Sequence, residues 1–418
     1  MKIKLLLFLV AILSFSACLK DTCKSSQTYL RYEPIYKKTE EIRNFTIKMG
    51  PSKDLKNPGK IYTYGQYLLI NEINEGLHII DNTNPKNPVK LGFIEIPGNI
   101  DMAIQNNILY ADNYIDLLAI DISNIQNPTL LTRKESVFPE ISKSPDLGYL
   151  VGYHYTKVSL PCNSPKFLNE GGILYYENSN IKVDDISIFY NGIGTVPITG
   201  IGGSMARFTL AANHLYTIDN SNLKIFHLSN PQNPSLEKSM NLGWGIETIF
   251  PYKDKLFIGS NTGMFIYSNT NPSNPTFLST FTHSFACDPV FATDTRAYIT
   301  LRRGNTCSSN SDQLDVVDIT DLKNPKLLKT YPMFNPRGLS VNDKTLYLCD
   351  DGFKVFNIED DLKIDENRLS HINNIDTYDV IHLNDKNVAM VVGKDGLYQY
   401  NTQNNKDLIL LSKIPIVR

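Results

Sequence analysis

Leu77-His-Ile-Ile-Asp81 is the stretch of sequence that decides the fold, because the same five-residue pattern returns six more times. The other copies are Leu117-Leu-Ala-Ile-Asp121, Leu223-Lys-Ile-Phe-His227, Met264-Phe-Ile-Tyr-Ser268, Leu314-Asp-Val-Val-Asp318, Phe353-Lys-Val-Phe-Asn357 and Leu397-Tyr-Gln-Tyr-Asn401. Each copy is a short, mostly apolar run with high β-propensity that ends in a polar residue. The pattern therefore predicts seven buried strands, each closed by a turn.

The copies recur at a nearly constant spacing. They start at residues 77, 117, 223, 264, 314, 353 and 397, so five of the six gaps lie near one period. The long gap after 117 holds one repeat plus an insertion at about 137–201. Without it, residues 58–418 leave about 42 residues for each of seven units, the length of a propeller blade. We predict an all-β propeller of seven four-stranded blades, with six blades, or eight if the insertion hides one, left open.

Each unit repeats the same internal order. The first has strand-like runs at 60–64, 67–70, 77–81 and 89–96. A connector rich in asparagine and proline follows the pentapeptide, as in Asn84-Pro85-Lys86-Asn87-Pro88, and recurs at Asn127-Pro128, Asn230–Pro234, Asn271–Pro275 and Asn324-Pro325. Proline fixes φ and lacks an N–H, and asparagine caps turns through its side chain, so we expect a stiff turn that ends each third strand.

Two segments compete to close the ring. Glu41–Lys48 looks like a strand at the offset of an outer strand, and so does the C-terminal run Leu408–Val417. An open outer edge would be an aggregation hazard, so we expect one of the two to complete the last blade.

Residues 1–17 have the pattern of a secretory signal: Lys2 and Lys4, an apolar stretch, then small residues before Cys18. Phe15-Ser-Ala-Cys18 resembles a bacterial lipobox, which implies cleavage before Cys18 and lipid on that cysteine. Residues 18–57 would then be a lipidated tether with an N-terminal strand. The alternative is ordinary cleavage near Ala17 and release of a soluble protein. Leu19-Lys-Asp21 resembles the signal that carries such lipoproteins to the outer cell surface, with the periplasmic face as the alternative.

Composition excludes some partners. The net charge of −2 argues against nucleic acid and against polybasic attachment to a membrane, since both need a basic face. No apolar run of 18 residues follows the N-terminus, so we predict no bilayer-spanning segment. We expect a monomer.

Five cysteines follow Cys18, and none forms a CxxC pair, which argues against redox catalysis and a zinc ribbon. Cys287 and Cys307 flank the 290–300 stretch, so we predict a disulfide between them in an exported protein. Cys349 ends a strand-like run and is expected to be a small buried hydrophobe.

A charge recurs near the start of every innermost strand, eight or nine residues before the second strand of each unit. The seven residues are Lys60, Asp101, Arg207, Glu247, Asp288, Arg337 and Asp379. In a propeller these positions line the mouth of the central channel. One hypothesis is a structural ring of salt bridges. The other is a binding site for a cation or a small charged ligand, which the surplus of one acid would favour.

The scan for other chemistry is negative. Seven histidines show no HExxH motif and no paired spacing, so we predict no metal site, and His78 and His227 are expected to be packed structural residues. The chain has no GxSxG motif and no phosphate-binding loop, so we predict no catalytic residues and no cofactor. Trp244 is expected to pack beneath its loop, with a binding aromatic at the channel mouth as the alternative.

The pentapeptides Leu77–Asp81 and Leu314–Asp318 nearly spell the repeat of the LVIVD propeller lipoproteins of the Bacteroidota, which the mature chain resembles over essentially its whole length. Four copies lack the final Asp. The resemblance implies an envelope protein without a catalytic motif. We expect a binding or scaffold module at the outer membrane, with an envelope protein or a glycan as partner. The alternative is a propeller enzyme, or a protein that binds a small ligand or cation, using the charged ring.

Overall fold

The computed structural model describes residues 26–161, 174–176, 205–283, 289–303 and 312–417. The chain divides into two compact units. The smaller comprises Met1–Ile35 with Gly152–Ile186, and the larger comprises Tyr36–Val151 with Ser187–Arg418. No helix in the described ranges is long and apolar enough to cross a membrane.

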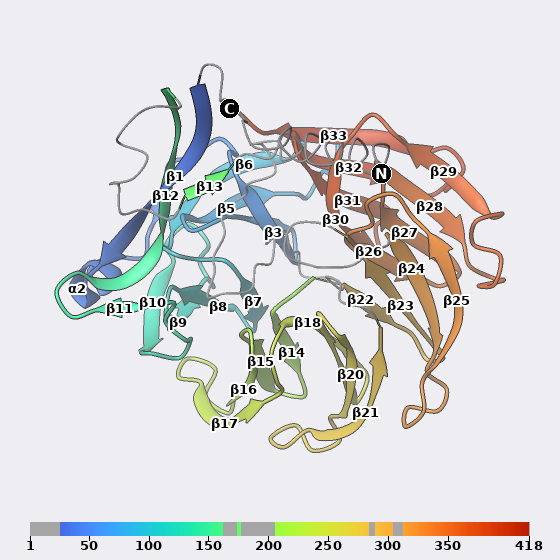
Figure 1. The fold of residues 1–418 in the computed structure, drawn as a ribbon, viewed down its shortest axis with the longest axis horizontal. Coiled ribbons are helices and arrows are strands. Elements are labelled where there is room, and N and C mark those ends of the chain that lie inside the picture. Colours follow the sequence, from blue (N-terminus) through green and yellow to red (C-terminus); the bar gives the residue numbers. More distant parts are fainter. Residues whose placement is uncertain (1–25, 162–173, 177–204, 284–288, 304–311, 418) are drawn as a thin grey trace, which may run out of the picture. The chain divides into compact units, whose positions relative to one another are not determined.

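The larger unit contains seven antiparallel sheets, each built in chain order (Figure 1). Blade 1 consists of β3 (Pro58–Tyr64), β4 (Tyr67–Glu72), β5 (Gly76–Asp81) and β6 (Val89–Glu95), and blade 2 of β7 (Met102–Gln105), β8 (Ile108–Asn113), β9 (Asp116–Asp121) and β10 (Thr129–Lys134). Blade 3 consists of β14 (Phe208–Ala211), β15 (His214–Ile218), β16 (Asn222–His227) and β17 (Ser235–Asn241), and blade 4 of β18 (Ile246–Tyr252), β19 (Lys255–Ser260), β20 (Gly263–Ser268) and β21 (Thr276–Thr282). Blade 5 consists of β22 (Val290–Ala292), β23 (Arg296–Leu301), β24 (Gln313–Asp318) and β25 (Lys326–Pro332), and blade 6 of β26 (Leu339–Asn342), β27 (Thr345–Cys349), β28 (Phe353–Asn357) and β29 (Arg368–Ile372). Blade 7 consists of β30 (Thr377–Leu383), β31 (Val388–Gly393), β32 (Gly396–Asn401) and β33 (Ile409–Pro415). A short strand, β2 (Met49–Gly50), pairs with the outer edge of β6.

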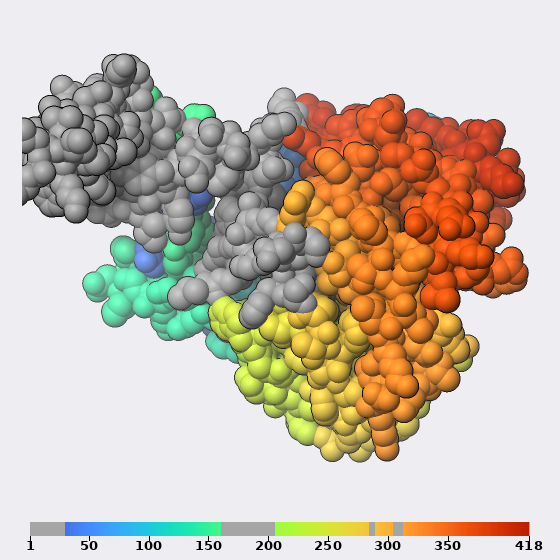
Figure 2. Space-filling view, turned by 45° about the vertical axis from the view of Figure 1, so that its right-hand side comes forward, coloured from blue at the N-terminus to red at the C-terminus, as the bar shows by residue number. Residues whose placement is uncertain are grey.

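The blades form a closed ring. The first strand of each blade contacts the first strand of the next, in the order β3, β7, β14, β18, β22, β26 and β30. An apolar cluster shared by blades 7 and 1 closes the circle. Blades 2 and 3 share a further cluster although the insertion separates them in sequence, so no blade lies between them. The prediction of seven blades is confirmed. In Figure 2 the surface from blade 3 to blade 7 runs in chain order, from yellow-green to red.

Each pentapeptide lies in the third strand of its blade, as predicted, and its apolar residues are largely buried. The final polar residue caps the turn that follows. Asp81 Oδ1 accepts a hydrogen bond from the Thr83 N–H at 2.9 Å, and Asn401 Oδ1 accepts one from the Gln403 N–H at 2.8 Å. His227 does the same through Nδ1, which accepts from the Ser229 N–H at 3.1 Å. Loss of the final Asp therefore leaves the turn capped wherever another acceptor replaces it.

The connectors are stiff turns, as predicted. In the first, the Asn87 N–H donates to the Asn84 carbonyl at 2.9 Å, and the same bond recurs in the later connectors. Several are also held by the preceding blade. The Tyr110 hydroxyl donates to the Pro231 carbonyl at 2.8 Å, and the Tyr216 hydroxyl donates to the Pro272 carbonyl at 2.9 Å. These bonds tie each such blade to its neighbour at the connector end.

The expected strand at 41–48 is wrong, because Glu41–Arg43 belong to a short helix, α2 (Thr39–Arg43), and residues 44–48 form no strand. Glu41 accepts the Lys38 N–H at 2.7 Å, which supports the first turn. Ile42 is buried with Ile115 and Tyr149, so tertiary packing decides this segment. The C-terminal run instead supplies β33, the outer strand of blade 7.

A further sheet has the strand order β11–β12–β1–β13, which is not the chain order. Its strands are β11 (Lys143–Ser144), β12 (Gly148–Pro161), β1 (Ser26–Lys37) and β13 (Leu174–Tyr176). β1 pairs with β13 in antiparallel fashion, so a segment before the first blade joins one from the long insertion. The sequence pattern did not predict this sheet.

Candidate functional site

The charged positions lie where the sequence placed them, in or just before the first strands. Lys60, Asp101, Glu247 and Asp379 are buried, and Arg207 and Arg337 are half-buried. Asp288 lies outside the described residues. The structure therefore describes six of the seven predicted positions. That they bind a ligand stays a prediction.

Asp101 connects three blades. Its carboxylate forms a buried ion pair with the Lys60 ammonium of blade 1. The same Oδ2 accepts the backbone N–H groups of Arg207 at 2.7 Å and Phe208 at 2.9 Å, in blade 3. Burial lowers the pKa of Lys60, and the attraction of Asp101 opposes that shift. This part of the ring is a structural network of the kind that the salt-bridge hypothesis describes.

Arg337 bonds outside the set of seven. Its guanidinium lies 3.2 Å from the Asp376 carboxylate and donates to the Thr377 carbonyl at 3.1 Å. It also lies 4.6 Å from the centre of the Tyr378 ring. Arg337 thus links blade 6 to the start of blade 7 rather than completing an alternating ring of the predicted residues.

A pocket of about 290 Å³ opens beside two ring members, Asp101 and Arg207. Its walls come from the starts of blades 2 to 4, from the β8–β9 and β15–β16 turns, and from the segment Phe138–Ile141. Phe138 stacks on Phe208 with ring centres 5.6 Å apart. The beginning of the long insertion therefore forms one wall of the pocket.

Trp244 stands at the pocket with 55% of its surface exposed, so the expectation that it packs beneath its loop is wrong. Gly243 and Gly245 have φ of +96° and +82°, a conformation that other L-residues rarely adopt. A Cβ on Gly245 would also lie 2.2 Å from Asn261 Oδ1. The two glycines shape a turn that leaves the indole in solvent.

The carboxylates of the pocket are held in place. Asp219 accepts the Lys224 ammonium at 2.6 Å and the Ser221 N–H at 2.9 Å; burial opposes ionisation, but these bonds hold the pKa of Asp219 below its usual value. Asp112 accepts the N–H groups of Ile100 and Asp101, yet burial raises its pKa to about 6. The pocket thus combines an exposed aromatic platform with fixed polar groups.

Cys349 is a buried free thiol in β27, as predicted, and burial raises its pKa. The predicted disulfide partners, Cys287 and Cys307, lie outside the described residues, and so does Cys18. His78 is buried and lies 2.9 Å from Glu72 Oε2, which confirms its structural role.

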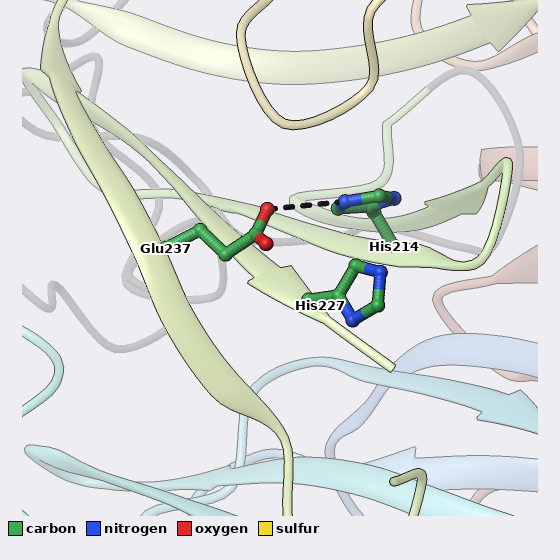
Figure 3. A group of neighbouring side chains, drawn as sticks. All are labelled: His214, His227 and Glu237. Carbon is green, nitrogen blue, oxygen red and sulfur yellow. Dashed lines mark hydrogen bonds and ion pairs between the residues drawn. The ribbon is translucent and has the colours of Figure 1, made fainter. Parts of the chain in front are cut away.

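Sequence reasoning missed a group that the structure assembles at the other end of blade 3. His214 begins β15 and His227 ends β16, so they lie directly opposite each other in the strand pair. Glu237 on β17 completes the group, and Figure 3 shows its carboxylate directed at the His214 ring. The signal lay in the alignment of repeats, because both histidines occupy blade positions that face each other.

The comparisons with known proteins support the repeat and the fold. The LVIVD repeat family matches residues 59–93 and 100–135. This chain carries LVIVD repeats. No curated protein matches it.

Several solved structures resemble the LVIVD-repeat chain at low identity. A protein from Lactobacillus plantarum is 12% identical, with 94% of this chain and 97% of that chain covered and a TM-score of 0.54. A candidate 6-phosphogluconolactonase from Bacteroides fragilis is 10% identical, with 95% and 97% covered and a TM-score of 0.52. The computationally designed Ika8 protein is 8% identical, with 88% and 90% covered and a TM-score of 0.51. These likenesses show the propeller fold alone.

Proposed function

We propose that this LVIVD-repeat propeller is a non-catalytic binding protein of the cell envelope that holds a glycan at the Trp244 pocket. The observation that carries the proposal is the exposed indole beside Arg207 and Asp101. A sugar ring offers an apolar face that stacks on an indole, and hydroxyls that bond to charged and amide side chains. Asn220 and Asn222, which also line the pocket, supply such amides.

The bonding of the pocket acids favours binding over acid–base chemistry. Asp101 and Asp219 each accept a lysine ammonium as well as backbone N–H groups, and for Asp219 these bonds hold the pKa below its usual value. A general acid or base needs a pKa near the working pH and a carboxyl group that can reach a substrate. Asp112 meets the first condition, but its side chain is buried and its Oδ1 accepts the N–H groups of Ile100 and Asp101. The likeness to the candidate lactonase is one of fold and adds no support for an enzyme.

The sequence of the N-terminus supports the proposed location. We place the protein at the outer membrane, anchored by lipid on Cys18 and facing the cell surface, because Phe15–Cys18 and Leu19–Asp21 resemble the corresponding signals. The periplasmic face is the alternative. Cys18→Ser should move the protein into the aqueous phase of a detergent partition, and unchanged partitioning would exclude the anchor.

The glycan proposal has a direct optical test, because Trp244 is the single tryptophan of the chain. Neutral and acidic oligosaccharides released from the native envelope should be titrated into the Cys18→Ser protein lacking residues 1–17. A bound sugar should shift Trp244 emission to shorter wavelength. Arg207→Ala should weaken that response by roughly tenfold, since it removes the basic side chain of the pocket.

The matched control is Lys238→Ala, which removes a half-buried cation on β17 in the same blade but outside the pocket, where it bonds to Asn274. It should leave the titration unchanged. An emission spectrum that no oligosaccharide alters, or an equal response in Arg207→Ala, would overturn the glycan proposal.

A further inference from the structure

We propose that His214, His227 and Glu237 form a binding site for a divalent transition metal of borderline softness, with Zn²⁺ as its probe. One nitrogen of each imidazole and one carboxylate oxygen all lie within 4.8 Å of one another. The site lies at the connector end of blade 3, where β15 begins and β16 ends. None of its three residues lines the Trp244 pocket, so the proposal is independent of the proposed glycan function.

The repeat supplies a comparison within one chain. The pair of positions held by His214 and His227 exists in every blade, because the first residue of the second strand always faces the last residue of the third. The other six pairs are Tyr67 and Asp81, Ile108 and Asp121, Lys255 and Ser268, Arg296 and Asp318, Thr345 and Asn357, and Val388 and Asn401. Blade 3 alone among these pairs carries two imidazoles.

Glu237 departs from the repeat in the same blade. Every outer strand has a register shift near its start, which leaves one residue in a bulge. That residue is Leu in six blades, namely Leu91, Leu131, Leu278, Leu328, Leu369 and Leu411. Five of these leucines pack against apolar clusters shared by neighbouring blades. In blade 3, Glu237 replaces the leucine, and the bulge can direct its carboxylate at the two histidines.

The His214 ring is oriented as a metal ligand. Its Nδ1 lies 2.8 Å from the Ala212 carbonyl, which can only accept, so Nδ1 carries the proton. In the neutral ring, Nε2 then points a lone pair at Glu237 Oε2, 3.2 Å away. Two lone pairs at that distance repel unless a cation lies between them. A backbone carbonyl that holds the far nitrogen of a ligating histidine is the usual support of a metal site.

His227 has two roles that compete. Its Nδ1 now accepts the Ser229 N–H, and metal ligation through either nitrogen would take that bond away. The imidazole–metal bond outweighs one backbone hydrogen bond at an exposed turn. Ligands of a tetrahedral Zn²⁺ lie about 3.3 Å apart, so the group must contract, which Glu237 can do because its side chain is 32% exposed.

The ligand set favours zinc over calcium or magnesium. Two imidazoles and one carboxylate suit Zn²⁺ and its neighbours, whereas Ca²⁺ and Mg²⁺ require oxygen ligands. The Ser273 hydroxyl of the blade 4 connector lies 3.0 Å from His214 Nε2. The connectors of blades 1, 5 and 7 carry Lys86, Lys323 and Lys406 at the corresponding position, so blade 4 places no cation beside the group.

The test is a titration of tag-free protein with Zn²⁺, in which binding is measured by calorimetry or by competition with a chromogenic chelator. Wild type should bind one Zn²⁺ and melt at a higher temperature when Zn²⁺ is present. Glu237→Leu and His227→Asn should each weaken binding by roughly tenfold or more. Both variants install the residue that another blade carries at that position, and Asn retains the turn acceptor, so both should fold.

His154→Asn is the control, since it removes an exposed histidine of β12 that lies outside the group. It should bind Zn²⁺ as wild type does. No uptake of Zn²⁺ by wild type would overturn the proposal and leave a proton on His214 as the cation that bridges it to Glu237. Uptake that persists unchanged in both Glu237→Leu and His227→Asn would place the metal elsewhere and would overturn it equally.

Discussion

Asp112 in blade 2 shows how burial makes one residue sensitive to pH. Its folded-state pKa of about 6 exceeds the ordinary value of 3.8, so the folded protein holds the Asp112 proton more tightly than the unfolded chain does. The resulting contribution to the free energy of unfolding is complete below about pH 4 and is lost as the pH rises through 6. Wild type should therefore lose about 2 to 3 kcal/mol relative to Asp112→Asn between about pH 4 and pH 7. Chemical denaturation at both pH values measures the difference.

Asp121 in the same blade is the matched control. Its pKa is lowered by bonds from Ser123, so its contribution to stability has the opposite sign and is lost as the pH falls. If Asp121→Asn and Asp112→Asn shifted stability with pH in the same direction, the assignment of Asp112 would be wrong.

The third strands depend on the cap at their end more than on the identity of the last residue. Asn401 of β32 uses its side-chain oxygen to hold the Gln403 N–H at 2.8 Å. Asn401→Ala should lower the free energy of unfolding by about 1 kcal/mol, because it removes that acceptor. Asn401→Asp keeps an acceptor and should remain within about 0.5 kcal/mol of wild type in the same chemical denaturation. Equal losses in the two variants would show that the cap is not the reason for the polar residue.

The closed ring depends on the contact between blades 7 and 1. There the buried amides of Asn82 and Gln399 exchange two hydrogen bonds, of 2.9 Å and 2.8 Å, across 317 residues of sequence. Gln399→Leu should lower stability by about 2 kcal/mol, because it leaves the Asn82 amide buried without its partner. The double variant Asn82→Leu/Gln399→Leu should recover part of that loss in a double-mutant cycle. If the two single losses simply added in the double variant, this amide pair would not couple the blades.

The sequence by itself determined the repeat architecture, because the information for it is local. Alternating apolar runs, the polar residue that caps each pentapeptide and the proline-containing connectors all act within a few residues of the chain. The ring positions such as Lys60 and Asp101 followed from the same register, and so did the buried Cys349.

Only the tertiary structure decided the features that depend on contacts between distant segments. Residues 39–43 form a helix that Ile42 anchors by packing against blade 2 and a neighbouring strand, contacts that come from distant segments of the chain. Trp244 stays exposed because two glycines shape its turn beside a pocket whose walls come from three blades and the 138–141 segment. His214 meets His227 and Glu237 through strand pairing and a bulge, and neither leaves a spacing signal in the linear sequence. Repeats fix where each residue lies within its blade, but the pairing of strands and blades decides which side chains meet.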